Sequence, residues 1–436
     1  MTGNISRTSN GKSRELSATN NGWLSKIVSC LIPFIPLVIY YYVPFTTVSF
    51  DTAVVFVVSA FVLLSAIANN ERIDTKNGGF YFLLVLWTLA ISTLYFFLSR
   101  YKVNYGIGLW YILLVFLVIV GVEKGTLENH LILETYRFLS ITAMVLVGIQ
   151  WLVFLLTGYQ LSFLLFFLQF NDAYPLVDAQ LLTSDSTAGA QFSAFFSERS
   201  HFCLFITPFL CMSIYDFLQN KRGIWLPLLA TTVMLSTTSG NGIIVSAVAW
   251  IVATFFLIKG KKRIVCLVLV VLLAFGVYLV LRQIPEYDSI FGKLFIKANK
   301  YSHSKADYRI YRGFDYYSQL PTFNKIFGIG YRCLDSSFAY YHLVDHFDTT
   351  GEYMGCIGQI LVYSGALGML LFLLFVGKLF IGSNNLSRTV LVCFLAYCVS
   401  SSIYFDAVWI LYFAIIFSLN RLLNQDLRRP KTNDVV

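Results

Sequence analysis

Residues 264–281 read IVCLVLVVLLAFGVYLVL, a run of eighteen residues that contains no charged side chain. An α-helix of this length covers about 27 Å, which approaches the roughly 30 Å hydrocarbon thickness of a bilayer. Similar runs recur along the 436 residues, of which 57% are hydrophobic and 13% charged, about half the charged fraction of an ordinary soluble domain. The sequence therefore predicts an all-α, polytopic integral membrane protein built as a helical bundle.

Nine apolar runs have the length that a membrane-spanning helix needs, namely residues 24–43, 52–68, 80–98, 107–122, 138–157, 202–218, 243–258, 264–281 and 356–376. Two longer intervals, residues 223–258 and 389–420, lack Lys and Arg but would each measure roughly 50 Å as one helix. Each is therefore divided into two helices, the first at Ser239–Gly242 and the second near Ser400 and Asp406. The first division adds one helix to the nine and the second adds two, so we predict about twelve transmembrane helices.

The basic residues predict the orientation of these helices. With a cytoplasmic N-terminus, most of the 32 Lys and Arg residues fall in cytoplasmic segments, and the short connections on the other side are poor in them. Both termini are therefore predicted to face the cytoplasm. The two long loops, residues 158–200 and 284–355, are predicted to be periplasmic, because loops of this length cross the membrane regardless of their charge.

The predicted layout has seven parts. They are a disordered cytoplasmic tail (1–22), helices 1 to 5 (23–157), a periplasmic loop with an interfacial helix at 161–170 (158–200), helices 6 to 9 (201–283), a large cationic periplasmic loop (284–355), helices 10 to 12 (356–420) and a cytoplasmic tail (421–436). The run at 161–170 is apolar but too short to cross, which favours an interfacial position.

The composition also bounds the chemistry. We assign the formal net charge of +9 to the loops rather than to a nucleic-acid-binding surface. The sequence contains no phosphate-binding glycine loop, zinc-ligand spacing or Cys-x-x-Cys pair, so we expect no cofactor, metal or nucleic acid. Seven of the 8 cysteines lie in or beside predicted spans, and only Cys333 lies in a long loop. A Cys333–Cys356 disulfide is an alternative that the sequence leaves open.

Ionisable residues meet the start of one predicted span in the sequence Phe195-Phe196-Ser197-Glu198-Arg199-Ser200-His201. Glu198 and His201 are three residues apart and share a helical face. One interpretation is structural, with Ser197 as N-cap, Glu198 favoured by the helix dipole and Arg199 reaching the headgroups. The other is functional, with a carboxylate, a guanidinium and an imidazole at the edge of a lipid-facing cavity.

The cationic loop contains a second cluster. Arg309 and Arg312 fall on one helical face, and paired guanidiniums suit a pyrophosphate. The alternative is a solvated basic helix with stacked tyrosines. His342 and His346 are weak candidates individually, since a single loop histidine is more often incidental.

Three stretches together resemble a known family. Phe196-Ser197-Glu198-Arg199-Ser200-His201-Phe202 is similar to the F-x-E-P-S-H-F entry to a central span of Wzy-type O-antigen polymerases, with Arg199 where proline is usual. The arginine pair at 309 and 312, followed by Pro321 and Phe327-Gly328-Ile329-Gly330, resembles the arginine helix and Gly-x-Gly turn of that family. Gly365-Ala366-Leu367-Gly368 resembles the Gly-x-x-Gly segment after the loop. The resemblance covers most of the chain and extends to the wider O-antigen ligase and polymerase superfamily.

This resemblance implies a GT-C-like glycosyltransferase in the bacterial inner membrane, with its active site facing the periplasm. Its substrate would be an undecaprenyl-pyrophosphate-linked oligosaccharide within membrane lipid, and a chain-length regulator protein would be a possible partner. Arg309 and Arg312 would bind the pyrophosphate, assisted by Arg199 or Arg332. Glu198 or His201 would be the first choice of catalytic base, and His342 or His346 the second.

Two other functions stay open at this stage. Ligases of the superfamily tend to carry a His-Asn pair before the Gly-x-x-Gly segment, where this chain has Glu352-Tyr353-Met354-Gly355, although His346 lies nearby. A flippase or exporter of lipid-linked oligosaccharide would also suit about twelve helices. Transporters seldom need so long an outer loop, which favours the polymerase.

Overall fold

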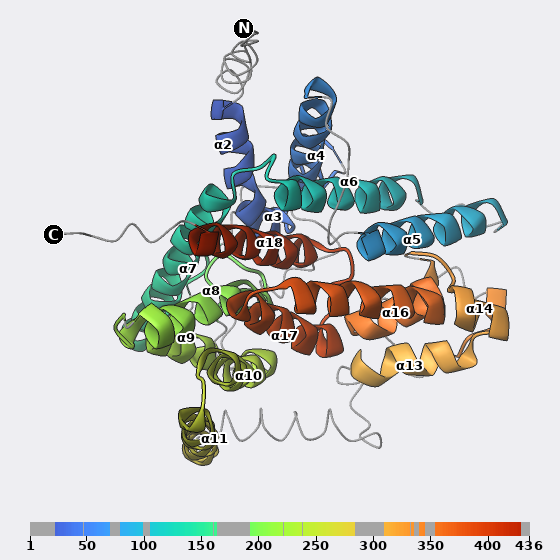
Figure 1. Cartoon of the computed structure of the whole chain (residues 1–436). Coiled ribbons are helices and arrows are strands. Elements are labelled where there is room, and N and C mark those ends of the chain that lie inside the picture. The colour runs from blue at the N-terminus through green and yellow to red at the C-terminus, as the bar shows by residue number, and fades with distance from the viewer. Residues whose placement is uncertain are drawn as a thin grey trace, which may run out of the picture.

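The computed structural model describes residues 22–46, 48–69, 79–98, 105–159, 161–163, 192–220, 222–237, 239–283, 309–331, 333–334, 340–344 and 354–428. Within these ranges the chain is helical, and the one β-bridge pairs Tyr42 with Ser49 (Figure 1). The all-α prediction is therefore confirmed for the described part of the chain. The N-terminal tail at 1–21 and most of the predicted interfacial helix at 161–170 lie outside the described residues.

Apart from two short helices at 309–319 and 322–327, the helices lie on the apolar runs of the sequence, and the run predicted as one span at 24–43 is divided among three short helices. In chain order they are α2 (Gly22–Leu31), η1 (Ile32–Phe34), α3 (Ile35–Val38), α4 (Phe50–Ala68), α5 (Gly79–Leu98), α6 (Tyr105–Lys124), α7 (Asn129–Thr157), α8 (Arg199–Asn220), α9 (Trp225–Ser236), α10 (Gly240–Leu257), α11 (Lys261–Leu281), α13 (Arg309–Gln319), α14 (Thr322–Phe327), α16 (Cys356–Gly382), α17 (Asn385–Ser400) and α18 (Ala407–Arg428). Among the described residues, six helices are long and apolar enough to cross a membrane: α4, α7, α8, α10, α11 and α16. The chain is therefore a helical membrane protein.

The predicted divisions of the long apolar intervals are present, with one shift. The chain leaves helix between α17 and α18, near Ser400 and Asp406 as predicted. In the other interval, however, Gly240–Gly242 belong to the first turn of α10 rather than to a turn between helices. The cause is Ser239, whose side chain caps the helix by accepting from the Gly242 amide. A side chain at Gly242 would also meet Cys203 of α8 at 2.3 Å, so glycine is needed for packing.

The centre of the bundle is formed by α18. Its residues from Ala407 to Ile416 are all buried, and Trp409 lies in contact with aromatic rings from α16, α17 and the segment before α18. A helix that is apolar on every side is removed from water either by protein or by lipid, and α18 is enclosed by protein. The opposite case is α11, whose apolar window has no buried residue and which lies at the margin of the bundle in Figure 1.

Helix α8 continues through Pro208, although proline removes an amide from the helix interior. Without that amide, the carbonyl of Leu204 loses its helical partner. Tyr412 of α18 replaces it, with a hydroxyl that donates to the Leu204 oxygen at 2.9 Å. Tyr136 of α7 inserts one residue further on, donating to the Phe205 carbonyl and accepting from the Phe209 amide. Two tyrosines from neighbouring helices thus stabilise a helix that proline would otherwise break.

We expect Tyr412→Phe to destabilise the protein by about 1–3 kcal/mol, because it leaves a buried carbonyl without its donor. The measurement is the midpoint of thermal unfolding in detergent. Tyr159→Phe is the control, since that side chain is 57% exposed. Equal midpoints for the two variants would contradict the bridging role of Tyr412.

The alternative of a Cys333–Cys356 disulfide is wrong. Both thiols are buried, and neither forms a disulfide. Cys356 instead lies beside Cys398 of α17, and its backbone amide donates to the Ser401 oxygen at 2.8 Å. Cys333 donates to the Tyr331 carbonyl at 3.1 Å.

Candidate functional site

The entrance to α8 is held in place by α7. The side-chain oxygen of Gln150 accepts from the amides of Ser193 and Ala194 at 3.1 and 2.9 Å. The ring of Phe192 packs on Trp151 with centroids 4.2 Å apart. Ala194 has a positive φ of 53°, a backbone conformation that needs such support. These contacts with α7 hold the residues before α8 in a fixed position.

The predicted N-cap of α8 is wrong by one residue. The helix begins at Arg199, and the carbonyl of Glu198 accepts from the amides of His201 and Phe202, so Glu198 rather than Ser197 occupies the cap position. The structural cause is the tight turn over 193–196, in which Ser193 donates to the Phe196 carbonyl. The Glu198 carboxylate accepts from Ser200 at 2.8 Å and interacts electrostatically with Arg199.

His201 meets a residue that the sequence analysis missed. Its Nδ1 lies 2.6 Å from the hydroxyl of Tyr40, and the two rings are stacked at 5.8 Å. Tyr40 follows α3 and is completely buried. The only signal in the sequence was the run Tyr40-Tyr41-Tyr42 at the end of an apolar stretch, which was assigned to the first span. Tyr40 fixes the orientation of the imidazole, which both a base and a hydrogen-bond donor require.

Two carboxylates act on this pair, and a third interacts with one of them. Glu198 and Asp406 both lie close enough to Tyr40 to act on its hydroxyl electrostatically. Asp406 also interacts with Asp51, which is buried at the start of α4 and accepts from the Tyr111 hydroxyl at 3.2 Å. The ends of α3, α4, α8 and α18 thus gather acidic, phenolic and imidazole groups at one place. Of these, the sequence analysis had named only Glu198 and His201 as candidates.

The segment 401–406, between α17 and α18, connects this cluster to α5, α10, α16 and the chain after α14. Hydrogen bonds join it to α10, α16 and the chain after α14. The Asn241 side chain donates to the Ser401 hydroxyl, and the Tyr331 hydroxyl donates to the Tyr404 carbonyl. In the other direction, the Tyr404 amide donates to the Gln359 side chain. The Tyr404 hydroxyl lies 3.0 Å from both Thr88 and Ser364. A connection predicted as a simple turn is therefore the junction of several helices.

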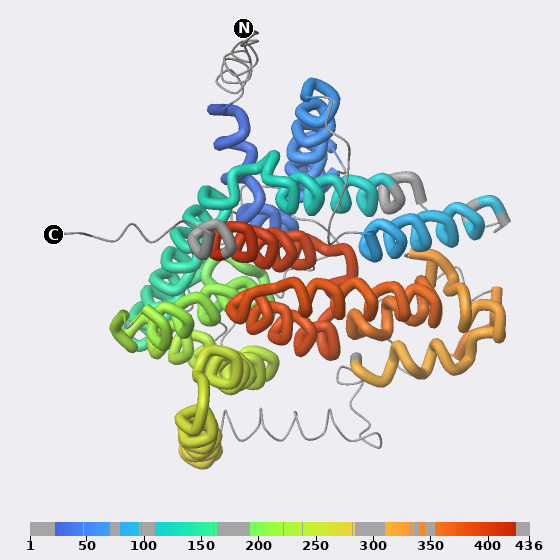
Figure 2. The backbone as a smooth tube through the Cα atoms, viewed as in Figure 1, coloured from blue at the N-terminus to red at the C-terminus, as the bar shows by residue number. Residues whose placement is uncertain are grey.

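Arg312 lies on the buried face of α13. It is only 2% exposed, Gly313 and Tyr316 continue the buried face along the helix, and Leu320 directly after the helix is buried as well. The helix packs closely on α16, since a side chain at Gly313 would come within 2.3 Å of the Gly358 backbone. Arg312 is therefore not on a solvated helix face, which was the alternative interpretation. Figure 2 shows α13 lying alongside α16.

Two of the three stretches that carry the family resemblance meet in space. Gly365 interrupts α16 with φ 68° and ψ −173°, and the turn at Gly328 and Gly330 lies against this interruption. The amides of Ile329 and Gly330 donate to the carbonyls of Val362 and Tyr363 at 3.1 and 2.9 Å. Carbonyls that the broken helix leaves without helical partners are thereby satisfied.

The remaining predicted residues are less well placed or not described. Arg309 begins α13, one turn before Arg312, and its side chain lies outside the described residues. His342 is exposed, with a positive φ of 52°. Arg332 and His346 fall outside the described residues.

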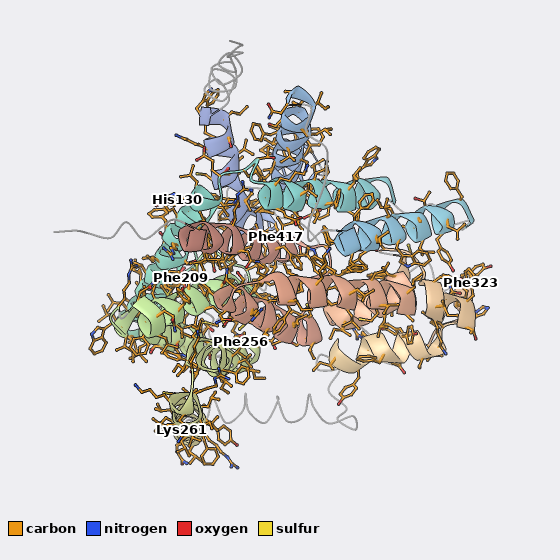
Figure 3. The ribbon with its side chains drawn as sticks, viewed as in Figure 1. His130, Phe209, Phe256, Lys261, Phe323 and Phe417 are labelled. Carbon is orange, nitrogen blue, oxygen red and sulfur yellow. The ribbon has the colours of Figure 1, made fainter. Side chains whose placement is uncertain are left out.

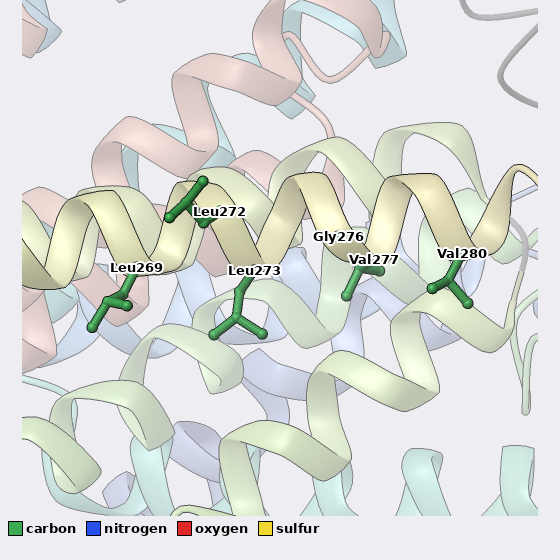
Figure 4. A pocket seen from close by; sticks show the side chains of 6 residues that line it. All are labelled: Leu269, Leu272, Leu273, Gly276, Val277 and Val280. Atoms are coloured by element: carbon green, nitrogen blue, oxygen red, sulfur yellow. The ribbon is translucent and has the colours of Figure 1, made fainter.

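A shallow apolar hollow lies elsewhere, along α11 (Figure 4). It is lined by Leu269, Leu272, Leu273, Gly276, Val277 and Val280. These side chains offer no polar group for chemistry, and they suit contact with lipid. The polar cluster at the start of α8 and the buried Arg312 on α13 remain as two candidate regions.

Comparison with known proteins finds no family model that matches this chain and no curated sequence similar to it.

Proposed function

We propose that this protein polymerises lipid-linked oligosaccharide repeat units in a bacterial inner membrane, as the resemblance to Wzy-type polymerases implies. It has about twelve transmembrane helices, both termini in the cytoplasm and its reactive groups toward the periplasm. The observation that carries the proposal is the position of Arg312. Arg312 is 2% exposed on α13, which packs against the candidate membrane helix α16, and an ionisable side chain buried beside a membrane helix supports a functional role.

The reaction transfers the growing glycan from undecaprenyl pyrophosphate to a sugar hydroxyl of the next lipid-linked unit. The bond between the anomeric carbon and the pyrophosphate oxygen breaks, and this oxygen keeps the electron pair. The acceptor oxygen bonds to the anomeric carbon and loses its proton to a base. Arg312, with Arg309 one turn earlier, stabilises the charge that develops on the pyrophosphate, and Arg199 or Arg332 assists.

The base is assigned to the start of α8. Glu198 and His201 lie within one turn of each other, and the Tyr40 hydroxyl orients the His201 ring. Proton transfer requires a group held in a defined position, which this arrangement provides. His342, which is exposed, and His346 are the second choice. The substrate supplies the leaving group, and the proposal uses no cofactor; a chain-length regulator is a possible protein partner.

The test is a clean deletion of the gene, read out by the lipopolysaccharide gel profile together with extracted lipid-linked intermediates. We expect core capped by a single repeat unit without a ladder, and restoration of the ladder by the wild-type gene in trans. Uncapped core would overturn the proposal. Polymer stranded on undecaprenyl pyrophosphate would then identify a ligase, and single units held on the cytoplasmic face would identify a flippase.

A further inference from the structure

The chain that follows α13 passes along the outer part of α5, and side-chain contacts give its path. At Asn324 the side-chain amide bonds to the hydroxyl of Tyr95. Three residues later, the ring of Phe327 packs on Trp87 with centroids 5.7 Å apart. The contacts thus shift by eight residues along α5, about 12 Å along its axis, of which the three residues of α14 rise about 4.5 Å and the long side chains of Tyr95 and Trp87 span the rest.

The chain then returns along the same helix. The amide of Tyr331 donates to Ser92 at 2.9 Å, and the hydroxyl of Tyr341 lies 3.3 Å from that of Tyr95. The order of contacts along α5 is therefore 95, 87, 92 and 95. This is the path of a segment that goes in and comes back out on one side.

The depth of the turning point follows from the sequence of α5. Its 20 residues, Gly79–Leu98, contain no charged side chain, and basic residues flank them at Arg72 and Lys76 before and Arg100 and Lys102 after. Trp87 stands near the middle of this apolar length. If α5 crosses the membrane, the turn at Gly328 lies well inside the hydrocarbon region.

Backbone polar groups inside a bilayer must be satisfied by protein, and the turn meets this requirement. The amides of Ile329 and Gly330 donate to α16, as described above, and the amide of Gly328 donates to Asn324 at 2.7 Å. The carbonyl of Gly328 accepts from the Asn324 side chain at 3.2 Å. Irregular backbone is therefore packed against α16 and shielded.

The opposite side of this segment is apolar and exposed. Phe323 is 55% and Ile326 is 46% exposed, and Figure 3 shows Phe323 on the side of α14 that faces away from the bundle. On the adjoining part of α5, Leu94 and Phe97 are exposed as well. Lys325 is half-buried, and its long side chain is able to extend to the headgroup region while its stem stays in the apolar layer.

We propose that residues 322–331 form a re-entrant segment in the outer half of the bilayer, with Phe323 and Ile326 in contact with the acyl chains of membrane lipid. Part of the predicted periplasmic loop is then a membrane element, which holds the Arg312 helix at the bilayer surface. The inference rests on the contacts with α5 and α16 and is independent of the reaction assigned above.

The test places a nitroxide spin label at Phe323→Cys and Ile326→Cys in the full-length protein, reconstituted in liposomes. Cys30 and Cys266 are changed to Ala, because they are the two cysteines that are not buried. Leu272→Cys, on the exposed apolar face of α11, is the lipid control. Gly223→Cys is the water control, since it is exposed and a side chain there meets nothing nearer than 3.8 Å.

Accessibility to oxygen and to a water-soluble nickel chelate is measured by power saturation. We expect both labels to resemble the lipid control, with an oxygen-to-nickel ratio several-fold above that at Gly223→Cys. A nickel accessibility equal to the water control would place the segment in the periplasm and overturn the proposal. Low accessibility to both reagents would show that protein covers these residues, for example a second copy of the chain, and would overturn it too.

Discussion

Arg312→Ala is expected to abolish the polymer ladder while the protein still inserts into the membrane. The guanidinium is buried and therefore pre-positioned, and removing one such donor to developing charge typically costs about 10²–10³ in rate. Arg312→Lys is expected to restore short chains only, because an ammonium keeps the charge but loses the planar fork that binds a pyrophosphate at two points. The measurements are the ladder in a deletion strain and the amount of protein that elutes as a single species in detergent.

The control has to separate chemistry from packing, since truncation of any buried side chain weakens a helix contact. Arg312→Met keeps most of the volume and removes the charge, so it is expected to behave as the alanine variant does. Leu320→Ala removes a buried apolar side chain directly after α13 without touching a charge. It is expected to lower the unfolding midpoint and keep the ladder. A normal ladder from Arg312→Met at wild-type protein level would eliminate the role assigned to Arg312.

The helices of this protein were predictable because each is a local property of the sequence. A run of apolar residues with no Lys or Arg specifies a membrane helix by itself, and the ranges from sequence agree with α4 to α11 and α16 to α18. Proline effects are only partly local. Pro208 alone would predict a broken helix. Helix α8 nevertheless continues, because the hydroxyl of Tyr412, far along the chain, donates to the carbonyl of Leu204.

The candidate site, too, was predictable only where its residues are close together in the sequence. Glu198 and His201 could be placed near each other from sequence because they are only three residues apart, although Glu198 is the cap of α8 rather than part of the helix. Tyr40 and Asp406 could not be added to them, because their proximity depends on how α3, α8 and α18 pack. The resemblance named both Gly328 and Gly365, and nothing in their local sequence indicated that the two lie against each other.

The junction between those two glycines provides the second large effect. Gly365→Ala is expected to destabilise the protein by at least about 3 kcal/mol, for two reasons. Its φ of 68° with ψ of −173° belongs to a region that is essentially restricted to glycine. A side chain there would also come within 2.3 Å of the Ile326 carbonyl and 2.5 Å of the Gly328 amide. The measurement is the unfolding midpoint in detergent.

Gly158→Ala is the matched control, because Gly158 has the same φ of 68° but open space around it. It is expected to cost only about 1 kcal/mol, the backbone cost of a left-handed alanine. Gly328→Ala brings a side chain to 2.3 Å from the Tyr363 carbonyl on the other side of the same junction. The double variant should therefore lose less stability than the sum of the two single changes, since either change alone separates the turn from α16. Full additivity, or a Gly365→Ala effect no larger than that of Gly158→Ala, would mean that the turn and the helix do not depend on each other.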